Sequence, residues 1–125
     1  MKVTRFQTVL ILGMLCMCTP SAYATVAFKN YQELKENTLF QTYIEGVGVG
    51  YVIANSVLRV SRHQDPLFCT PSKLALTQKN YLTILDNYIS KHDVKGEHGE
   101  DRPVEVLLLI ALRDVFPCKK TNLDE

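Results

Sequence analysis

The chain has no tryptophan, no internal repeat and no surplus of charge, since 14 lysines and arginines face 13 aspartates and glutamates in 125 residues. This balance offers no general attraction to nucleic acid or to an anionic membrane surface, so neither is an expected partner. Cysteine is also scarce. Of the four present, Cys16 and Cys18 lie near the N-terminus, which leaves only Cys69 and Cys118 in the rest of the chain.

Residues 1–24 have the layout of a secretory signal peptide. Lys2 and Arg5 precede an apolar run over 9–17, and the small-residue motif Ala22-Tyr23-Ala24 follows it. A membrane anchor is the alternative, but this run is shorter than the roughly 20 residues that span a bilayer. We therefore expect export to the periplasm with cleavage after Ala24, and no membrane insertion of the mature protein.

Lipidation is a further alternative, because Cys16 and Cys18 lie close to the expected cleavage site. Each follows a large residue, however, where a bacterial lipoprotein site requires a small one. Cleavage after Ala24 leaves 101 residues, 25–125, with 12 basic and 13 acidic side chains once the two N-terminal basic residues are removed. That length suits one compact domain with one core.

In an oxidising compartment Cys69 and Cys118 have only each other as intramolecular partners, which predicts one disulfide. Closing a loop of about 50 residues destabilises the unfolded chain by roughly 4 kcal/mol. Pairing also removes both thiols as candidate nucleophiles. The expected role of these cysteines is therefore structural.

Apolar periodicity predicts an all-α fold, a small bundle of four to five helices. Asn30 is expected to cap a first helix over 31–37, with Glu33 completing a capping box. The apolar spacing then predicts a long, largely buried helix over about 39–62. His63 to Pro66 ends that helix and leads into an irregular connection.

Two further helices are expected in the C-terminal half. Thr77 is a competent N-cap for an amphipathic third helix. Pro103 suits the first turn of a fourth helix that extends to Phe116. The fourth is apolar nearly all round, which favours a central position, with a β-strand as the alternative. Residues 119–125 are expected to form a mobile polar tail.

Three glycines, Gly46, Gly48 and Gly50, interrupt the long second helix. The phosphate-binding fingerprint spaces its glycines differently and follows a strand, so a ligand role is not favoured. Gly46 and Gly50 lie one helical turn apart and would let another helix approach, either from this chain or from a second subunit. Together with Tyr43 and Tyr51 they are the predicted helix-packing or dimer positions.

The segment 91–102 is strongly polar and must be a solvated loop between the third and fourth helices. A metal site, a plain solvated turn and a protruding partner-binding loop are the three interpretations. No compact ligand spacing supports a metal, so no metal and no cofactor are expected. The candidate partner-binding residues are His92, Asp93, Lys95, Gly96, Glu97, His98, Gly99 and Glu100.

Catalytic patterns are missing: there is no nucleophile-elbow serine, no helix-borne metal pair and no obvious acid and base couple. The sequence therefore predicts a binding protein rather than an enzyme.

Four segments carry a resemblance to a known family. In order they are Tyr43-Ile44-Glu45-Gly46-Val47-Gly48-Val49-Gly50-Tyr51, Leu67-Phe68-Cys69-Thr70-Pro71, Asn80-Tyr81-Leu82-Thr83-Ile84-Leu85-Asp86-Asn87-Tyr88, and 112–118 ending in Phe116-Pro117-Cys118. This chain resembles the Rap/Tai immunity proteins, which neutralise peptidoglycan amidase toxins delivered by type VI secretion. The resemblance covers about 30–118. The chain lacks the second cysteine pair that many relatives carry in their first two helices.

The resemblance implies a periplasmic, all-helical, homodimeric protein that occludes a papain-like amidase by inserting a loop into its substrate cleft. The inserted element would be the loop 92–102. Its side chains best placed for contacts are Asp93, Lys95, Glu97, His98 and Glu100. Swapping this loop should then swap toxin specificity.

Two other functions fit the same features. A small periplasmic acid-stress chaperone also combines a signal peptide, a compact helical domain and one disulfide. It would use protonation changes of His92, Asp93, Glu97, His98, Glu100 and Asp101. An inhibitor of the host's own lysozyme or wall hydrolases would differ mainly in its partner.

Overall fold

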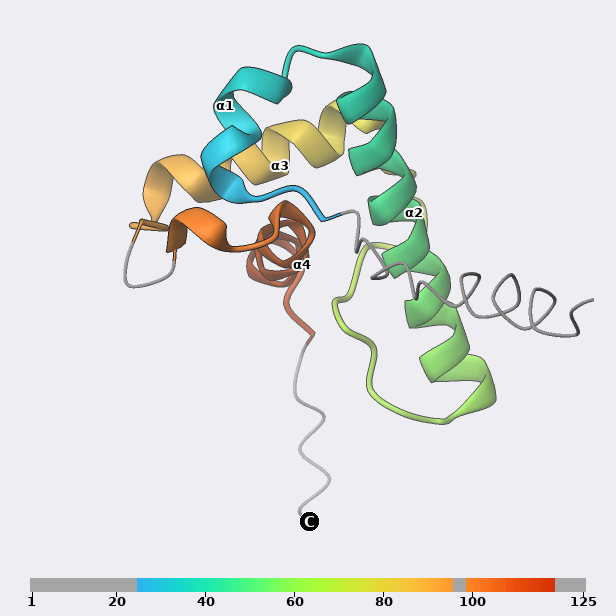
Figure 1. The fold of residues 1–125 in the computed structure, drawn as a ribbon. Helices are drawn as coiled ribbons and strands as arrows, with labels where there is room; N and C mark the ends of the chain where they lie inside the picture. Colours follow the sequence, from blue (N-terminus) through green and yellow to red (C-terminus); the bar gives the residue numbers. More distant parts are fainter. Residues whose placement is uncertain (1–24, 96–98, 119–125) are drawn as a thin grey trace, which may run out of the picture.

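The computed structural model describes residues 25–95 and 99–118. The predicted signal peptide and the predicted tail over 119–125 lie outside these residues. Within them the fold is all-α, with one isolated bridge between Ala27 and Pro103 and no strand. The helical elements are η1 (Phe28–Asn30), α1 (Tyr31–Leu34), α2 (Thr38–Ser61), α3 (Gln78–Lys91), η2 (Gly99–Asp101) and α4 (Val104–Val115) (Figure 1).

Side-chain caps begin the two long amphipathic helices. The Asn37 side chain accepts hydrogen bonds from the backbone N–H of Leu39 and Phe40, at 2.9 and 3.3 Å, and so begins α2. Thr77 and Asn80 form a reciprocal capping box at the start of α3. Both caps satisfy backbone N–H groups that a helix leaves unpaired. The predicted long helix and the predicted cap at Thr77 are confirmed. The prediction that the long helix is largely buried is wrong, because only Phe40, Ile44, Gly48 and Asn55 of α2 are buried.

The first helix differs from its prediction. Helix α1 has four residues and ends at Leu34, and no side-chain hydrogen bond caps it. The predicted capping box of Asn30 and Glu33 is therefore wrong. Asn30 belongs to the preceding turn η1 and has helical dihedral angles (φ −90°, ψ −7°), whereas a capping residue is normally extended. Helix α1 cannot extend further, because Asn37 takes an extended conformation (φ −78°, ψ 126°) to cap α2.

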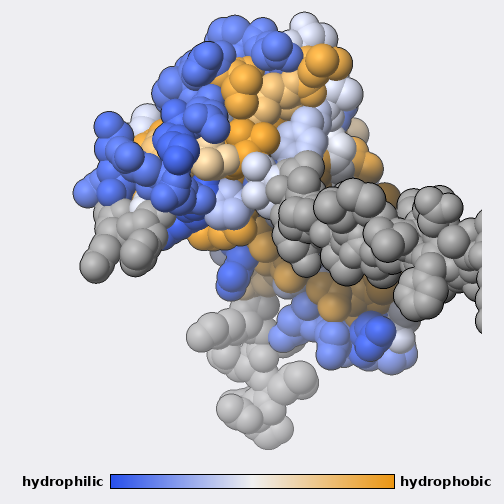
Figure 2. Space-filling view, in the orientation of Figure 1, coloured by the Kyte–Doolittle hydropathy of each residue, from blue (hydrophilic) through white to orange (hydrophobic). Residues whose placement is uncertain are grey.

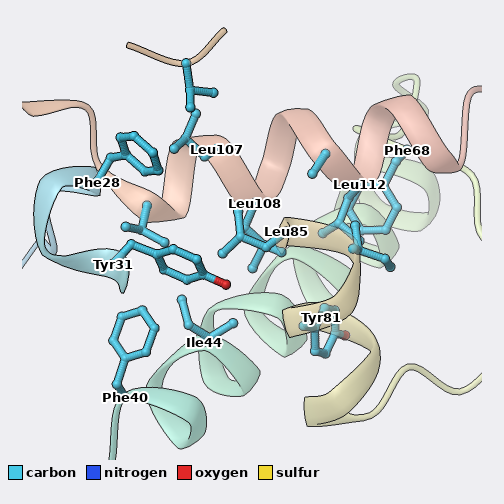
Figure 3. Packing of buried hydrophobic residues seen from close by; sticks show 14 residues of the cluster. Phe28, Tyr31, Phe40, Ile44, Phe68, Tyr81, Leu85, Leu107, Leu108 and Leu112 are labelled. Atoms are coloured by element: carbon cyan, nitrogen blue, oxygen red, sulfur yellow. The ribbon is translucent and has the colours of Figure 1, made fainter. Parts of the chain in front are cut away.

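Helix α4 lies at the centre of the fold, as expected, and is not a strand. Its inner face is fully buried at Val104, Leu107, Leu108, Ala111 and Leu112. Figure 3 shows these leucines facing side chains that come from the other helical elements, among them Tyr31, Phe40, Ile44, Tyr81 and Leu85. The outer face is less buried than predicted. Val106 and Val115 remain 43% and 48% exposed.

The irregular connection 62–77 is fastened at two points. The Asn55 side chain, buried on α2, donates a hydrogen bond to the Phe68 carbonyl (2.8 Å) and accepts one from the Leu67 N–H (2.6 Å). The predicted disulfide joins Cys69 to Cys118, with 4.9 Å between their Cα atoms. The connection is thereby held against α2 and the end of α4. No helix in the described ranges is long and apolar enough to cross a membrane.

Candidate partner-binding site

The loop between α3 and α4 begins with a stacked pair of rings. The His92 ring lies on the Tyr88 ring, with 4.2 Å between the centroids and 19° between the planes. The His92 Nδ1 atom lies 3.0 Å from the Tyr88 carbonyl oxygen. The Asp93 carboxylate then accepts a hydrogen bond from the Lys95 N–H at 3.1 Å, which makes a local turn. These contacts fix the direction in which the chain leaves α3.

Val94 and Gly99 close the base of the loop. Val94 is buried in the core, and a Cβ atom placed on Gly99 would collide with the Val94 carbonyl oxygen. Gly99 has no positive φ, so this position requires glycine for close approach and not for backbone conformation. The two described ends of the loop therefore lie next to each other.

Segment η2 ties the far side of the loop to the N-terminal turn. Lys29 donates a hydrogen bond to the Asp101 carboxylate at 2.8 Å, and this bond raises the pKa of the lysine. The Phe28 N–H donates to the Arg102 carbonyl at 2.9 Å. The exposed ion pair contributes little to stability. The backbone hydrogen bond and the burial of Phe28 link η1 to the loop more strongly, so η1 holds this end of the loop in place.

The candidate residues that the structure describes lie together. His92, Asp93, Lys95 and Glu100 are exposed, whereas Gly99 is buried. Figure 2 shows hydrophilic surface gathered where the described ends of the loop lie. Gly96, Glu97 and His98 lie outside the described residues. Among those described, no group of three histidine, cysteine, aspartate or glutamate side chains could hold a metal ion.

A second candidate surface is the outer face of α2. Gly46 and Gly50 are exposed, and within 4 Å of either there is no atom of another element. Tyr43 and Tyr51 instead bind α4 of the same chain, Tyr43 through the Glu105 carboxylate and Tyr51 through the Glu105 carbonyl. Of the four predicted packing residues, only the two glycines thus remain available to a second helix. The exposed apolar residues of α2 are Leu39, Val49, Val52, Ile53, Val57 and Val60.

Two open grooves separate α2 from the connection 62–77. The more apolar one, of about 240 Å³, lies between Ile53, Leu74 and Tyr81. The other, of about 350 Å³, runs past Arg59 to Cys69. They share Val52 and Thr70 in their walls, so the apolar face of α2 continues into this region.

Comparison of the chain with family models, with curated proteins and with solved structures found no match.

Sequence reasoning missed two residues that organise the structure. Asn55 holds the connection 62–77, and Glu105 joins α4 to α2 and to the N-terminal segment. A signal existed for Asn55, because an amide inside an apolar helical run is costly to bury unless it is hydrogen-bonded. Glu105 had no such signal. Acidic residues are common in the first turn of a helix because they interact favourably with the helix dipole, so one more there does not indicate a tertiary contact.

Proposed function

We propose that this chain is a periplasmic immunity protein that binds a cognate peptidoglycan amidase, delivered by type VI secretion, and blocks its active-site cleft. The observation that carries the proposal is the loop between α3 and α4. Its ends are held together at Val94 and Gly99, while His92, Asp93, Lys95 and Glu100 are exposed around them. The resemblance to the Rap/Tai proteins assigns the inserted element to this same loop.

The geometry of the loop suits insertion into a polar cleft. Both ends of the loop are anchored by buried residues. The helices next to the loop are therefore already ordered, and binding a partner loses little further conformational entropy from them. Its exposed side chains carry both signs of charge, which favours specific pairing with a partner over general attraction. The disulfide closes a covalent ring around α3, the loop and α4, because Cys69 precedes α3 and Cys118 follows α4.

The first test is whether the chain protects a cell. The exported protein is co-expressed with the candidate amidase directed to the periplasm, and lysis is followed by optical density. Inhibition of peptidoglycan cleavage by the purified amidase is measured in parallel. The proposal expects survival, a stable complex on gel filtration and loss of amidase activity. Lysis without a complex would contradict it.

Matched charge reversals locate the contact. Glu100→Lys alters the loop, whereas Asp65→Lys makes the same change of charge at an exposed position in the connection 62–77, which Figure 1 places away from the loop. We expect Glu100→Lys to weaken binding at least tenfold, about 1.4 kcal/mol, and Asp65→Lys to leave it unchanged. Equal effects of the two variants would remove the loop from the interface.

We also propose that two copies associate through the outer face of α2. Leu39, Ile53 and Val60 are 81%, 58% and 76% exposed, which is unusual for three large apolar side chains on one helix. Residues 46, 50, 53, 57 and 60 recur at three- and four-residue spacing, and residue 39 lies two helical turns before 46, so they lie on one face. The glycines at 46 and 50 would allow two helices to cross closely at this face.

Sedimentation velocity tests this dimer. Ile53→Lys places a charge in the middle of the apolar face, while Thr83→Lys adds the same charge at an exposed position of α3. We expect the first variant to be monomeric at concentrations where the parent protein and the second variant are dimeric. A monomeric parent protein would refute the dimer and leave the amidase proposal standing.

The same apolar face favours a second candidate function, an acid-stress chaperone. If low pH dissociated the dimer, Val49, Ile53 and Val57 would become available to unfolded clients. This alternative predicts that the protein suppresses aggregation of acid-unfolded proteins, and that Ile53→Lys weakens the suppression. An absence of suppression at acid pH would eliminate it.

A further inference from the structure

Glu105 connects three separate parts of the fold. It lies in the first turn of α4, and its Oε1 atom accepts a hydrogen bond from the Tyr43 hydroxyl of α2. The same oxygen lies 3.2 Å from the Val26 N–H, which donates to it. The backbone carbonyl of Glu105 accepts a further bond from the Tyr51 hydroxyl at 2.9 Å. One residue thus holds α2, α4 and the N-terminal segment together.

The other carboxylate oxygen of Glu105 lacks a partner. Among the residues that the structure describes, Oε2 is the one buried side-chain oxygen or nitrogen without a hydrogen bond. Buried polar atoms are nearly always paired, because burial removes their water and an atom left without a partner destabilises the fold. A hydrogen-bond donor would stabilise this buried carboxylate oxygen, and a positively charged donor would form the strongest bond with it.

The N-terminal segment lies in a fixed position beside the Glu105 carboxylate, since Val26 bonds to its Oε1 atom. The Val104 N–H donates to the Val26 carbonyl at 2.8 Å, and the Phe28 N–H donates to the Arg102 carbonyl at 2.9 Å. Phe28 is buried in the core. Because adjacent backbone nitrogens are roughly 3–4 Å apart, the nitrogen of Thr25 lies near that of Val26, which itself donates a hydrogen bond to Glu105. Thr25 itself is exposed.

We propose that removal of the signal peptide completes this site, with the new α-ammonium group of Thr25 forming an ion pair with Glu105 Oε2. The proposal rests on the export and cleavage that the proposed function includes. A signal peptidase would hydrolyse the Ala24–Thr25 amide with one water molecule, leaving a carboxylate on Ala24 and an amine on Thr25. That amine takes up a proton near neutral pH.

The ion pair makes the stability of the fold depend on maturation. In the precursor, the Thr25 nitrogen is an amide that carries no charge. In the mature chain, the ammonium group supplies the missing donor while its remaining protons stay hydrated at the surface. The titratable groups in contact with Glu105 are Tyr43 and Tyr51 of α2, and burial raises the pKa of both phenols, so neither ionises near neutral pH. The mature chain is therefore more stable than any form extended at its N-terminus.

The test compares two forms of the protein, one that begins at Thr25 and one that carries a single additional glycine before it. Each form is prepared with Glu105 and with Glu105→Gln. At pH 7 we expect the additional glycine to lower the thermal midpoint by roughly 4–8 °C with Glu105 and by much less with Glu105→Gln. An equal shift in both backgrounds, or no shift in either, would overturn the proposal.

A second measurement does not depend on the variant's folding. NMR titration of the form that begins at Thr25 gives the pKa of its α-amine, which is about 7.7–8.0 in an unpaired terminus. The ion pair should raise this pKa, so its stabilisation is present below about pH 8 and disappears as the pH rises through the raised value. An ordinary pKa would overturn the proposal. Mass measurement of the exported protein checks cleavage at Ala24 separately.

Discussion

The aromatic ring of Tyr81 lies directly over Gly48, so that a Cβ atom at position 48 would be 2.5 Å from two of the ring carbons. Tyr81 is buried on α3, and Gly48 is buried on α2. The two helices can approach this closely only because position 48 has no side chain. We therefore expect Gly48→Ala to destabilise the fold by about 1–3 kcal/mol through overpacking, measured by urea unfolding.

Gly46→Ala and Gly50→Ala are matched controls on the same helix. Space within the chain is open around both positions, so alanine there should raise the stability of the monomer, measured at low protein concentration, by up to about 1 kcal/mol. A stable Gly48→Ala variant would show that Tyr81 has room to move. Of the three glycines, Gly48 is thus the one that packing inside the chain requires, whereas Gly46 and Gly50 are not needed for it.

The three main helices were predictable from their apolar periodicity, and α3 also from its cap. The helix 38–61 has a consistent stripe, and Thr77 begins α3 as its side chain suggests. The short α1 was not predictable in the same way. Asn30 and Asn37 are both competent caps by composition, and only the tertiary packing of Phe28 places Asn30 inside a turn and leaves Asn37 as the cap.

Removal of the Asn55 side chain should loosen the connection 62–77. Asn55→Ala leaves the Phe68 carbonyl and the Leu67 N–H without their partner, which we expect to cost about 2–4 kcal/mol in urea unfolding. The neighbouring Ser56→Ala is the control, because its exposed hydroxyl bonds only to its own helix at Val52. A change within about 0.5 kcal/mol is expected there. Similar losses in both variants would contradict the role assigned to Asn55.

Reduction of the disulfide should destabilise the domain without changing its fold class. Cys69 and Cys118 are 49 residues apart. Opening a loop of this size raises the entropy of the unfolded chain and so lowers its free energy by roughly 4 kcal/mol. The urea midpoint should fall when a thiol reductant is added. A double variant, Cys69→Ala with Cys118→Ala, should begin at the lower midpoint and not respond to the reductant. A response in that variant would assign the effect to something other than this bond.

The candidate site was predictable in its location but not in its construction. A polar segment of twelve residues between two apolar helices, 91–102, marks a surface loop in any all-α fold. The contact between Val94 and Gly99 depends on the burial of Val94 in the core, and the ion pair of Lys29 with Asp101 joins residues 72 apart in sequence. Pairings of this kind follow from the packing of the core, and no local pattern encodes them.

Four tyrosines should make the fold sensitive to alkali. Burial is the first cause that raises the pKa of Tyr31, Tyr43, Tyr51 and Tyr81, and nearby Asp86, Glu105 or Glu45 carboxylates raise it further. Their neutral form is thus favoured in the folded state, whereas in the unfolded chain they ionise at about pH 10. Their stabilisation is complete below about pH 10 and is lost as the pH rises from there towards the raised values, by up to about 1.4 kcal/mol per pH unit for each tyrosine.

Phenolate absorbance and helical circular dichroism, recorded together from pH 9 to 13, test this expectation. Most of the phenolate signal should appear late and together with the loss of helix, because these tyrosines ionise only when the chain unfolds. In Tyr31→Phe the phenol bonded to Asp86 is absent, so stability measured at neutral pH and at pH 11 should differ by less than in the parent protein. If all the tyrosines ionised near pH 10 in a chain that stayed helical, the buried phenols would be accessible to hydroxide, and the stability of the core would not depend on their protons.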